Sequence, residues 1–287
     1  MSLNLIVRPV RACLAAVTAV LAMTGLLIAG GPARAATAGP AAAVGAAGGP
    51  RPTIVLVHGA WADSGSWNAV TRRLQRAGYT VDVPPNPLRG LAYDTAAIAS
   101  FLHTITGPVV LVGHSYGGAV ITNAAVGDSQ VKALVYDDAY LPAQGETLVS
   151  LTKPGSCFAV KDLSAVFNFV PFPGAPSGVF DAYVKPDVFR HCFANGLGES
   201  EGAVLAATQR PLATSTFADK SGVPAWKTIP SWDVVGTADH IITTAEQLFM
   251  ARRAHARITR VRAPHLSMIS SPGLVTRVII RAARATS

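Results

Sequence analysis

One serine of this chain stands in the setting that nucleophilic catalysis requires. Ser115 is the centre of Gly-His-Ser-Tyr-Gly at residues 113–117, between an apolar run at 109–112 and a helix-like run at 119–125. A strand, a sharp turn and a helix hold such a serine in a strained conformation, with its hydroxyl exposed above a sheet. The flanking glycines suit this turn because a side chain there would collide with the crossing helix or strand. The pattern predicts that Ser115 is a nucleophile.

A catalytic serine needs two partners, which the rest of the chain must supply. An imidazole takes the proton of the hydroxyl, and a carboxylate orients the imidazole. In this architecture the three follow in the order serine, acid, histidine. We predict His265, which follows the last strand-like run, as the base, and Asp239, which follows the preceding one, as the acid. Asp138 is the alternative acid; otherwise its carboxyl would bind loop amides.

The tetrahedral intermediate of acyl transfer also needs backbone donors. N–H groups aimed at its oxyanion are worth about a few kcal/mol each. One donor is expected from Tyr116, the residue after the nucleophile, and the other from the loop after the first strand-like run. That loop reads His-Gly-Ala-Trp-Ala at 58–62. We predict Ala60 as the second donor and expect His58 to shape the loop.

The elements that must position these residues alternate between strand and helix. Strand-like, mostly apolar runs lie at 53–57, 79–83, 109–112, 131–136, 232–236 and 257–261. Helix-like runs lie at 68–77, 95–104, 119–125, 245–254 and 272–283. Continuous apolar runs are typical of parallel strands that are covered on both faces. The alternation predicts an α/β fold with a mostly parallel, doubly wound sheet.

The alternation stops between about residues 142 and 224, where we predict an inserted cap over the carboxyl edge of the sheet. Short helices are expected there at 187–192 and 199–207. Cys157 and Cys192, the two cysteines that an exported chain would retain, are predicted to form a disulfide within the cap. Six phenylalanines of the cap either line an acyl pocket or form the cap's own core: Phe158, Phe167, Phe169, Phe172, Phe180 and Phe193.

Residues 1–35 have the pattern of a cleavable signal peptide. Arg8 and Arg11 precede an apolar stretch at 13–30, and Ala-Arg-Ala at 33–35 is an A-x-A cleavage site. We predict removal of this segment and secretion of the protein. The alternative is an uncleaved membrane anchor, since the apolar stretch is close to spanning length.

The rest of the chain is expected to hold one folded domain. Residues 36–50, almost entirely Ala, Gly and Pro, predict a disordered lead-in to a domain at 51–287. The formal charge is +8, and it becomes +5 without the first 35 residues, which hold three basic residues and no acidic ones. Because this modest excess is spread along the chain, we expect no nucleic-acid partner. We also expect no stable membrane insertion after cleavage.

Four motifs occur in the order of a known family. They are Val-His-Gly-Ala-Trp at 57–61, Gly-His-Ser-Tyr-Gly-Gly at 113–118, Gly-Thr-Ala-Asp at 236–239 and His-Leu-Ser-Met at 265–268. Over residues 53–285 the chain resembles the α/β-hydrolase superfamily, most closely the plant methylesterase and hydroxynitrile lyase branch and its bacterial relatives, in which the last motif reads His-x-x-Met. The secretory leader and the cysteine-bearing cap depart from the plant branch.

The resemblance implies an activity as well as a fold. It implies a Ser115–His265–Asp239 triad, oxyanion donors at Ala60 and Tyr116, and no metal or organic cofactor. The resulting hypothesis is a secreted serine hydrolase that cleaves small-molecule carboxylic esters through an acyl-enzyme intermediate. One alternative is a lyase or C–C bond hydrolase with the same triad, although hydroxynitrile lyases need a lysine near the site and none lies between Asp239 and His265. The other is a non-enzymatic ligand-binding protein on this fold.

Overall fold

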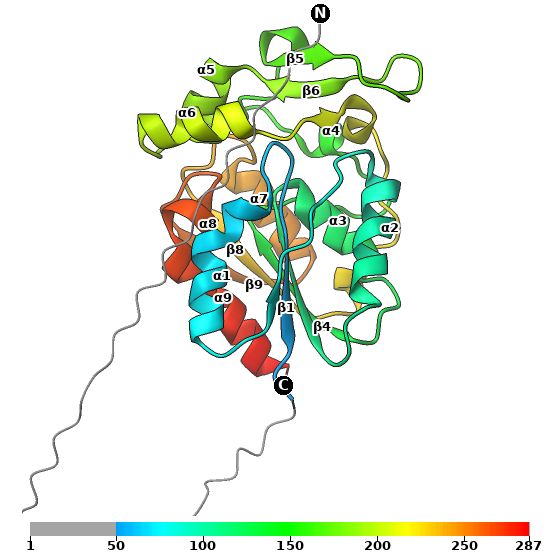
Figure 1. Ribbon diagram of the computed structural model, residues 1–287, viewed down its shortest axis with the longest axis vertical. Helices are drawn as coiled ribbons and strands as arrows, with labels where there is room; N and C mark the ends of the chain where they lie inside the picture. The colour runs from blue at the N-terminus through cyan, green and yellow to red at the C-terminus, as the bar shows by residue number, and fades with distance from the viewer. Residues whose placement is uncertain (1–49, 287) are drawn as a thin grey trace, which may run out of the picture. The chain divides into compact units, whose positions relative to one another are not determined.

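A six-stranded sheet forms the centre of the computed structural model, which describes residues 50–286 (Figure 1). All neighbouring strands of this sheet pair in parallel. Their order is β2 (Val81–Asp82), β1 (Thr53–Val57), β3 (Val109–His114), β4 (Val131–Asp137), β8 (Ser231–Gly236) and β9 (Arg257–Val261). The predicted α/β fold is therefore confirmed.

The strand order reverses between β1 and β3. From β1 the chain moves outward to β2, whereas from β3 it moves the other way, through β4 to β8 and β9. At such a switch point a crevice opens outside the carboxyl ends of the strands, and ligands bind there in open α/β sheets. The loops that follow β1 and β3 contain Ala60 and Ser115, so both residues lie at this crevice.

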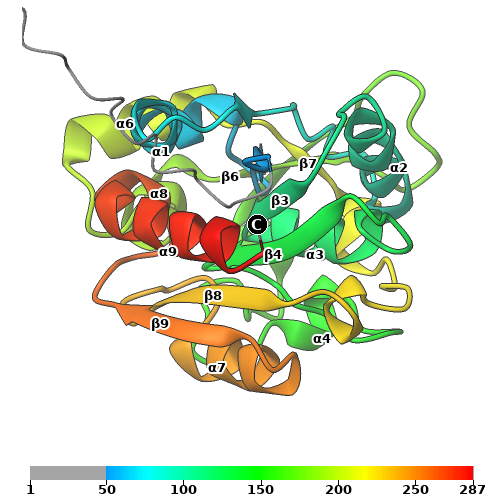
Figure 2. The same ribbon diagram turned by 90° about the horizontal axis from the view of Figure 1, so that it is seen from below.

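Helices cover both faces of the sheet (Figure 2). On one face α1 (Asn68–Arg76) packs against α9 (Pro272–Ala285), and on the other α2 (Leu91–Leu102) packs against α3 (Tyr116–Ala124). The helix α7 (Thr244–Arg253) contacts β8 and β9, and the short helices η1 (Ser64–Trp67) and α8 (Ser267–Ser270) contact α1. Because both faces are covered, β3 and β8 are buried along their whole length, which explains the continuous apolar run at 109–112 in β3.

Two elements near the crevice differ from the sequence prediction. The helix predicted at 95–104 begins at Leu91, because the Leu91 N–H donates to the distant carboxylate of Asp219 at 2.8 Å. The strand predicted at 79–83 is only two residues long, because it pairs with just two residues of β1.

The segment between β4 and β8 lies over the carboxyl ends of the strands (Figure 1). It contains a three-stranded antiparallel sheet that was not predicted from the sequence, in the order β5 (Phe167–Val170), β6 (Asp181–Val184) and β7 (Leu212–Ala213). Its helices are α4 (Leu148–Leu151), η2 (Leu163–Ala165), α5 (Pro186–Val188), the π-helical η3 (Phe189–Phe193), α6 (Glu199–Thr208), η4 (Thr214–Phe217) and η5 (Ala225–Lys227). The strands were missed because runs of two to four residues are too short to show a period of two.

A disulfide joins Cys157 to Cys192, the pair expected from the sequence. The two Sγ atoms are 2.20 Å apart and the two Cα atoms 6.2 Å apart. The bond links the loop before Phe158 to η3. In addition, the Cys157 N–H donates to the carbonyl oxygen of His240 at 2.9 Å, next to Asp239. The disulfide therefore holds two cap segments beside a loop of the central sheet.

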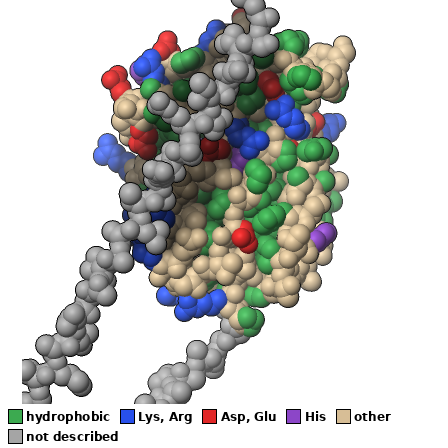
Figure 3. All heavy atoms as spheres, in the orientation of Figure 1, with side chains coloured by type: hydrophobic (Ala, Val, Ile, Leu, Met, Phe, Trp, Pro, Cys, Tyr) green, Lys and Arg blue, Asp and Glu red, His purple; other side chains and the backbone are tan. Residues whose placement is uncertain are grey.

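The predicted signal peptide, residues 1–35, and the lead-in, residues 36–50, lie outside the described residues apart from Pro50. Within residues 50–286, no helix is both long enough and apolar enough to cross a membrane. On the face drawn in Figure 3, Lys and Arg side chains lie apart from one another and do not form a single band.

Replacing both cysteines by serine should lower the free energy of unfolding by about 3–4 kcal/mol. The physical reason is that a bond between residues 35 positions apart restricts the unfolded chain. Urea unfolding followed by circular dichroism measures the change. A phosphine reductant should destabilise the wild type equally and leave the Cys157→Ser/Cys192→Ser variant unaffected. A wild-type midpoint that does not respond to the reductant would contradict this expectation.

Candidate active site

Ser115 lies in a strained turn between β3 and α3. Its backbone has φ 51° and ψ −124°, a conformation that non-glycine residues rarely adopt. The turn is tightly packed: a Cβ atom on Gly117 would lie 2.6 Å from the carbonyl oxygen of Val57, and one on Gly113 would lie 2.6 Å from that of Gly117. A side chain cannot fit at either position, so the glycines of the motif follow from the geometry.

The three residues of the predicted triad meet at the carboxyl ends of β3, β8 and β9. Ser115 Oγ lies 2.9 Å from His265 Nε2, and His265 Nδ1 lies 2.8 Å from Asp239 Oδ2. All three residues are buried. With the Nδ1–H group donating to the carboxylate, Nε2 is left as the acceptor for the serine proton. General-base activation of a hydroxyl requires this arrangement.

The carboxylate of Asp239 is held by three further donors. Its Oδ1 accepts from the N–H groups of Ile241 and Ile242 at 2.7 and 3.0 Å, and its Oδ2 accepts from Gln247 Nε2 at 2.8 Å. These contacts fix the orientation of the carboxylate toward His265. Gln247 was not identified from the sequence, since its contact with Asp239 depends on how α7 packs.

Asp138, the alternative acid, has another role in the structure. Its Oδ1 accepts from the Gly236 N–H at 2.7 Å and its Oδ2 from the Ser267 N–H at 3.3 Å. Burial, reinforced by the nearby charges of Asp137 and Asp239, raises the pKa of Asp138 well above its ordinary value and so favours the neutral form. Asp138 therefore binds loop amides, which was the alternative stated for it.

A second buried carboxyl lies on the same side of the site. The Ser267 hydroxyl donates to Asp137 Oδ1 at 2.6 Å. Burial raises the pKa of Asp137 to about 7, although the serine hydrogen bond acts in the opposite direction. Asp137 and Asp138 together tie the segment after His265 to the end of β4.

The two predicted oxyanion donors flank Ser115. A Cβ atom on Gly59 would lie 2.7 Å from Ser115 Cβ, so the loop that carries Ala60 passes directly beside the nucleophile. Tyr116 is the first residue of α3, where backbone N–H groups have no partner within the helix. Within the described part of the chain, the amides of Ala60 and Tyr116 have no hydrogen-bond acceptor, and both residues line the same cavity as Ser115.

His58 locks the loop that carries Ala60. Its Nδ1–H donates to the Gly59 carbonyl oxygen at 2.9 Å, and its Nε2 accepts from the Asn86 N–H at 2.9 Å. The Asn86 side chain donates in turn to the His58 carbonyl oxygen at 3.0 Å. Burial lowers the pKa of His58 to about 4, so the ring is neutral at physiological pH. Asn86 was not identified from the sequence.

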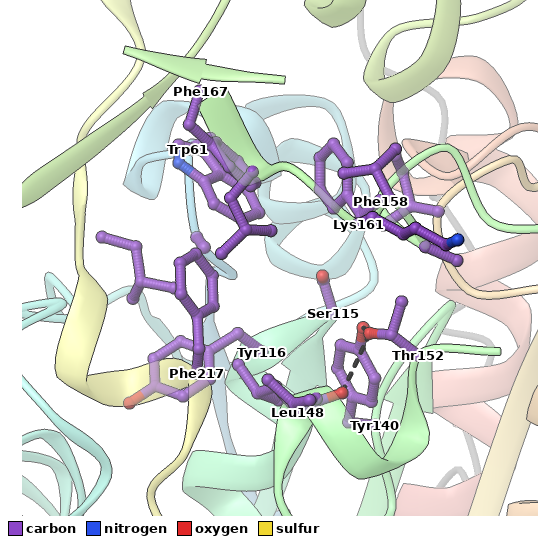
Figure 4. Close-up of a pocket in the computed structure, with 17 residues that line it drawn as sticks. Trp61, Ser115, Tyr116, Tyr140, Leu148, Thr152, Phe158, Lys161, Phe167 and Phe217 are labelled. Carbon is purple, nitrogen blue, oxygen red and sulfur yellow. Dashed lines mark hydrogen bonds between the residues drawn. The ribbon is translucent and has the colours of Figure 1, made fainter. Parts of the chain in front are cut away.

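Ser115 opens into a cavity of about 340 Å³ (Figure 4). Two of the six cap phenylalanines, Phe158 and Phe167, line it. Phe193 instead packs against the ring of His265, with centroids 5.1 Å apart. The other three, Phe169, Phe172 and Phe180, do not line the cavity. Trp61, Phe217, Tyr116 and Tyr140 also line it, and none of these four was predicted to form the pocket.

The contribution of His58 to the stability of the protein should be lost as the pH drops from about 6.5 to about 4, whereas Asp137, whose pKa is raised to about 7, acts in the opposite direction. Over this range His58 binds a proton in the unfolded chain but not in the folded protein. His58→Gln, which keeps an acceptor for the Asn86 N–H, should reduce the slope by up to about 1.4 kcal/mol per pH unit. Urea unfolding at pH 5, 6 and 7.5 tests this. A slope equal to that of the wild type would show that His58 makes no such contribution.

Comparison with known proteins gives a consistent picture. The model of the alpha/beta hydrolase family matches residues 54–278. A carbendazim hydrolyzing esterase from Nocardioides sp. is 34% identical over 111 residues, which are 34% of this chain and 46% of that protein; the chain thus matches about half the length of this relative. An alpha/beta hydrolase from Aspergillus novofumigatus is 26% identical over 255 residues, covering 81% of this chain and 97% of that protein.

The solved structures agree with this match. A methylesterase from Arabidopsis has a TM-score of 0.66 at 18% identity, over 82% of this chain and 99% of that chain. At this identity the likeness shows a common fold. The matched range 54–278 includes Ala60, Ser115, Asp239 and His265 as well as the cap. The chain therefore belongs to the alpha/beta hydrolase family.

Proposed function

We propose that this protein is a serine esterase that hydrolyses carboxylic esters of small molecules through an acyl-enzyme intermediate. The observation that carries the proposal is the hydrogen-bonded chain from Ser115 Oγ through His265 to Asp239. This chain ends in a cavity that the predicted oxyanion donors Ala60 and Tyr116 also line.

In the acylation step, Ser115 Oγ attacks the ester carbonyl carbon while His265 Nε2 takes the hydroxyl proton. The carbonyl oxygen becomes an oxyanion, which the amides of Ala60 and Tyr116 stabilise. When the carbonyl re-forms, the bond to the alcohol oxygen breaks and His265 returns its proton to that oxygen. Asp239 stabilises the imidazolium in between. The products of this step are the free alcohol and an acyl ester of Ser115.

Deacylation repeats the same steps with water. His265 takes a proton from a water molecule, whose oxygen attacks the acyl carbon of the Ser115 ester. The second tetrahedral intermediate then expels Ser115 Oγ, to which His265 gives the proton. The acid product leaves and the resting enzyme is restored.

The names of the relatives support the reaction class. One is a carbendazim hydrolyzing esterase and another is a methylesterase. Because these two names point to different substrates, they support ester hydrolysis as the reaction and leave the substrate to be argued from the cavity.

We further propose that the protein is secreted, with cleavage after Ala35. The Cys157–Cys192 disulfide supports this, since such bonds persist mainly in oxidising compartments. N-terminal sequencing of protein recovered from the culture medium should find Ala36 as the first residue; recovery from the cells only, with the leader intact, would contradict secretion.

Ser115→Ala should abolish ester hydrolysis, because it removes the atom that forms the covalent bond. A fluorophosphonate probe should label the wild type and an exposed control variant, Ser129→Ala, but not Ser115→Ala. Rates with p-nitrophenyl acetate and butyrate provide the second readout. If Ser115→Ala stays folded and keeps more than about one hundredth of the wild-type rate, another nucleophile is at work.

Asp239→Asn should lower kcat by on the order of a thousandfold or more, because an amide does not stabilise the imidazolium and disturbs the tautomer of His265. Asp138→Asn is the matched control, since this carboxyl bonds Gly236 and Ser267 and not His265. We expect it to reduce stability while kcat falls less than about tenfold. A larger kcat loss for a folded Asp138→Asn variant would transfer the role of the acid to Asp138.

A further inference from the structure

The cavity beside Ser115 is suited to neutral groups. Its volume of about 340 Å³ lies at the lower end of the range for small-molecule sites, roughly 300–1,000 Å³. Among the described residues that line it, Lys161 is the only charged one, and it is exposed. A charged substrate group inside the cavity would therefore lose hydration without a buried partner.

Aromatic side chains form one wall of the cavity (Figure 4). The ring of Trp61 stacks on Phe167 with centroids 5.3 Å apart and meets the edge of Phe158 at 5.2 Å. Phe217 lies 5.5 Å from Phe167. The Trp61 ring is fixed by its own N–H, which donates to the Ala182 carbonyl oxygen at 2.8 Å. Such a fixed wall offers both ring faces and ring edges to a flat aromatic group.

Two hydroxyl groups lie on the other side of Ser115 from Trp61 and Phe217. Figure 4 shows the Tyr140 and Thr152 side chains close together there, with Ser115 between them and the aromatic wall. The Tyr140 N–H donates to the Ser115 carbonyl oxygen at 3.1 Å, which places Tyr140 directly beside the nucleophile. An ester carbonyl at Ser115 would thus have aromatic rings on one side and a phenol on the other.

The phenol of Tyr140 is available as a donor to a ligand. The Thr152 hydroxyl donates its own proton to the Leu148 carbonyl oxygen at 2.9 Å, so it can only accept from Tyr140, and that contact is long, at 3.4 Å. Burial keeps the phenol protonated by raising the pKa of Tyr140 to about 12. A buried hydroxyl with only this weak acceptor gains free energy when a ligand oxygen replaces it.

We infer that the site takes neutral esters with an aromatic group on one side of the scissile bond and a hydrogen-bond acceptor oxygen on the other, and that Tyr140 is the residue that selects for this oxygen. The inference rests on the proposed esterase function and adds its substrate class. The aromatic group stacks on the wall of Trp61, Phe158, Phe167 and Phe217, while the Tyr140 hydroxyl donates to an ether or carbonyl oxygen of the opposite group.

The test of Tyr140 uses two pairs of isosteric esters, each made of an ether and its alkyl analogue. In 2-methoxyethyl phenylacetate and butyl phenylacetate, the aromatic group is on the acyl side of the scissile bond. In benzyl 3-methoxypropanoate and benzyl pentanoate, it is on the alcohol side. The ratio of kcat/KM for the ether to that for the alkyl ester is measured in a pH-stat. Tyr140→Phe should lower this ratio by about 3- to 10-fold in at least one orientation, the worth of one neutral hydrogen bond. Comparing the same two esters in both proteins cancels their intrinsic difference in reactivity.

Two controls separate this role from a structural one. In Tyr140→Phe, kcat/KM for the ether esters should fall more than kcat/KM for the alkyl esters, since the ring still packs and only the hydroxyl is lost. Tyr136→Phe removes another buried tyrosine hydroxyl, one bonded to Thr122 and outside the cavity, and should leave the ratio unchanged. A ratio that is the same in the wild type and Tyr140→Phe for both orientations would overturn the assignment of Tyr140.

The preference for an aromatic group is tested with 2-methoxyethyl cyclohexylacetate, in which a cyclohexyl ring replaces the phenyl ring of 2-methoxyethyl phenylacetate. The wild type should prefer the phenylacetate, and Phe217→Leu should reduce this preference by about 2- to 10-fold, the range expected from one aromatic contact. An equal preference for the phenylacetate in the wild type and in Phe217→Leu would overturn the proposed stacking of the aromatic group.

The inference and the proposed function can fail separately. If the wild type hydrolyses the esters without a preference for the ether or for the aromatic group, only the inference fails. If it hydrolyses none of them and resists the fluorophosphonate probe, the proposed function fails and the inference with it.

Discussion

The close passage of the turn at Ser115 against the end of β1 is the constraint on which the site depends. The parallel register places Gly113 opposite Val57, and the backbone at Gly117 then approaches the Val57 carbonyl so closely that no Cβ fits. This approach holds Ser115 at a positive φ, a strain of about 1–3 kcal/mol that a buried β3 can sustain. It also brings the loop of Ala60 beside the nucleophile.

Around that turn, the buried polar groups are arranged so that each key group has a defined role. Asp239 accepts four hydrogen bonds, from two loop amides, Gln247 and His265, and so keeps one orientation. Asp138 is also buried, but its two carboxyl oxygens accept hydrogen bonds from two loop amides and not from His265. Since a neutral carboxyl cannot stabilise an imidazolium, the surroundings of the two aspartates support the proposed role of Asp239 as the acid.

Features that depend on local sequence patterns could be predicted from the sequence. Features that depend on contacts between distant residues could not. The continuous apolar runs located the buried strands, and β1 was placed residue for residue. The glycines of the turn identified Ser115 because glycine is required where two backbone segments approach too closely for a Cβ atom. In contrast, the start of α2 depends on Asp219, far along the chain, and the support given by Asn86 and Gln247 exists only after packing. The short cap strands carried no periodic signal.

The cap is connected to the catalytic loops too closely to act as a separate lid. The Trp61 N–H donates to the carbonyl oxygen of Arg210, and its ring N–H to that of Ala182, so cap residues position the neighbour of Ala60. On the other side, Phe193 packs against the His265 ring. A shift of the cap would therefore move the loop of Ala60 and the ring of His265 as well as the aromatic wall. In the proposed esterase, the side chains that shape the cavity therefore also contact the loop of Ala60 and the ring of His265.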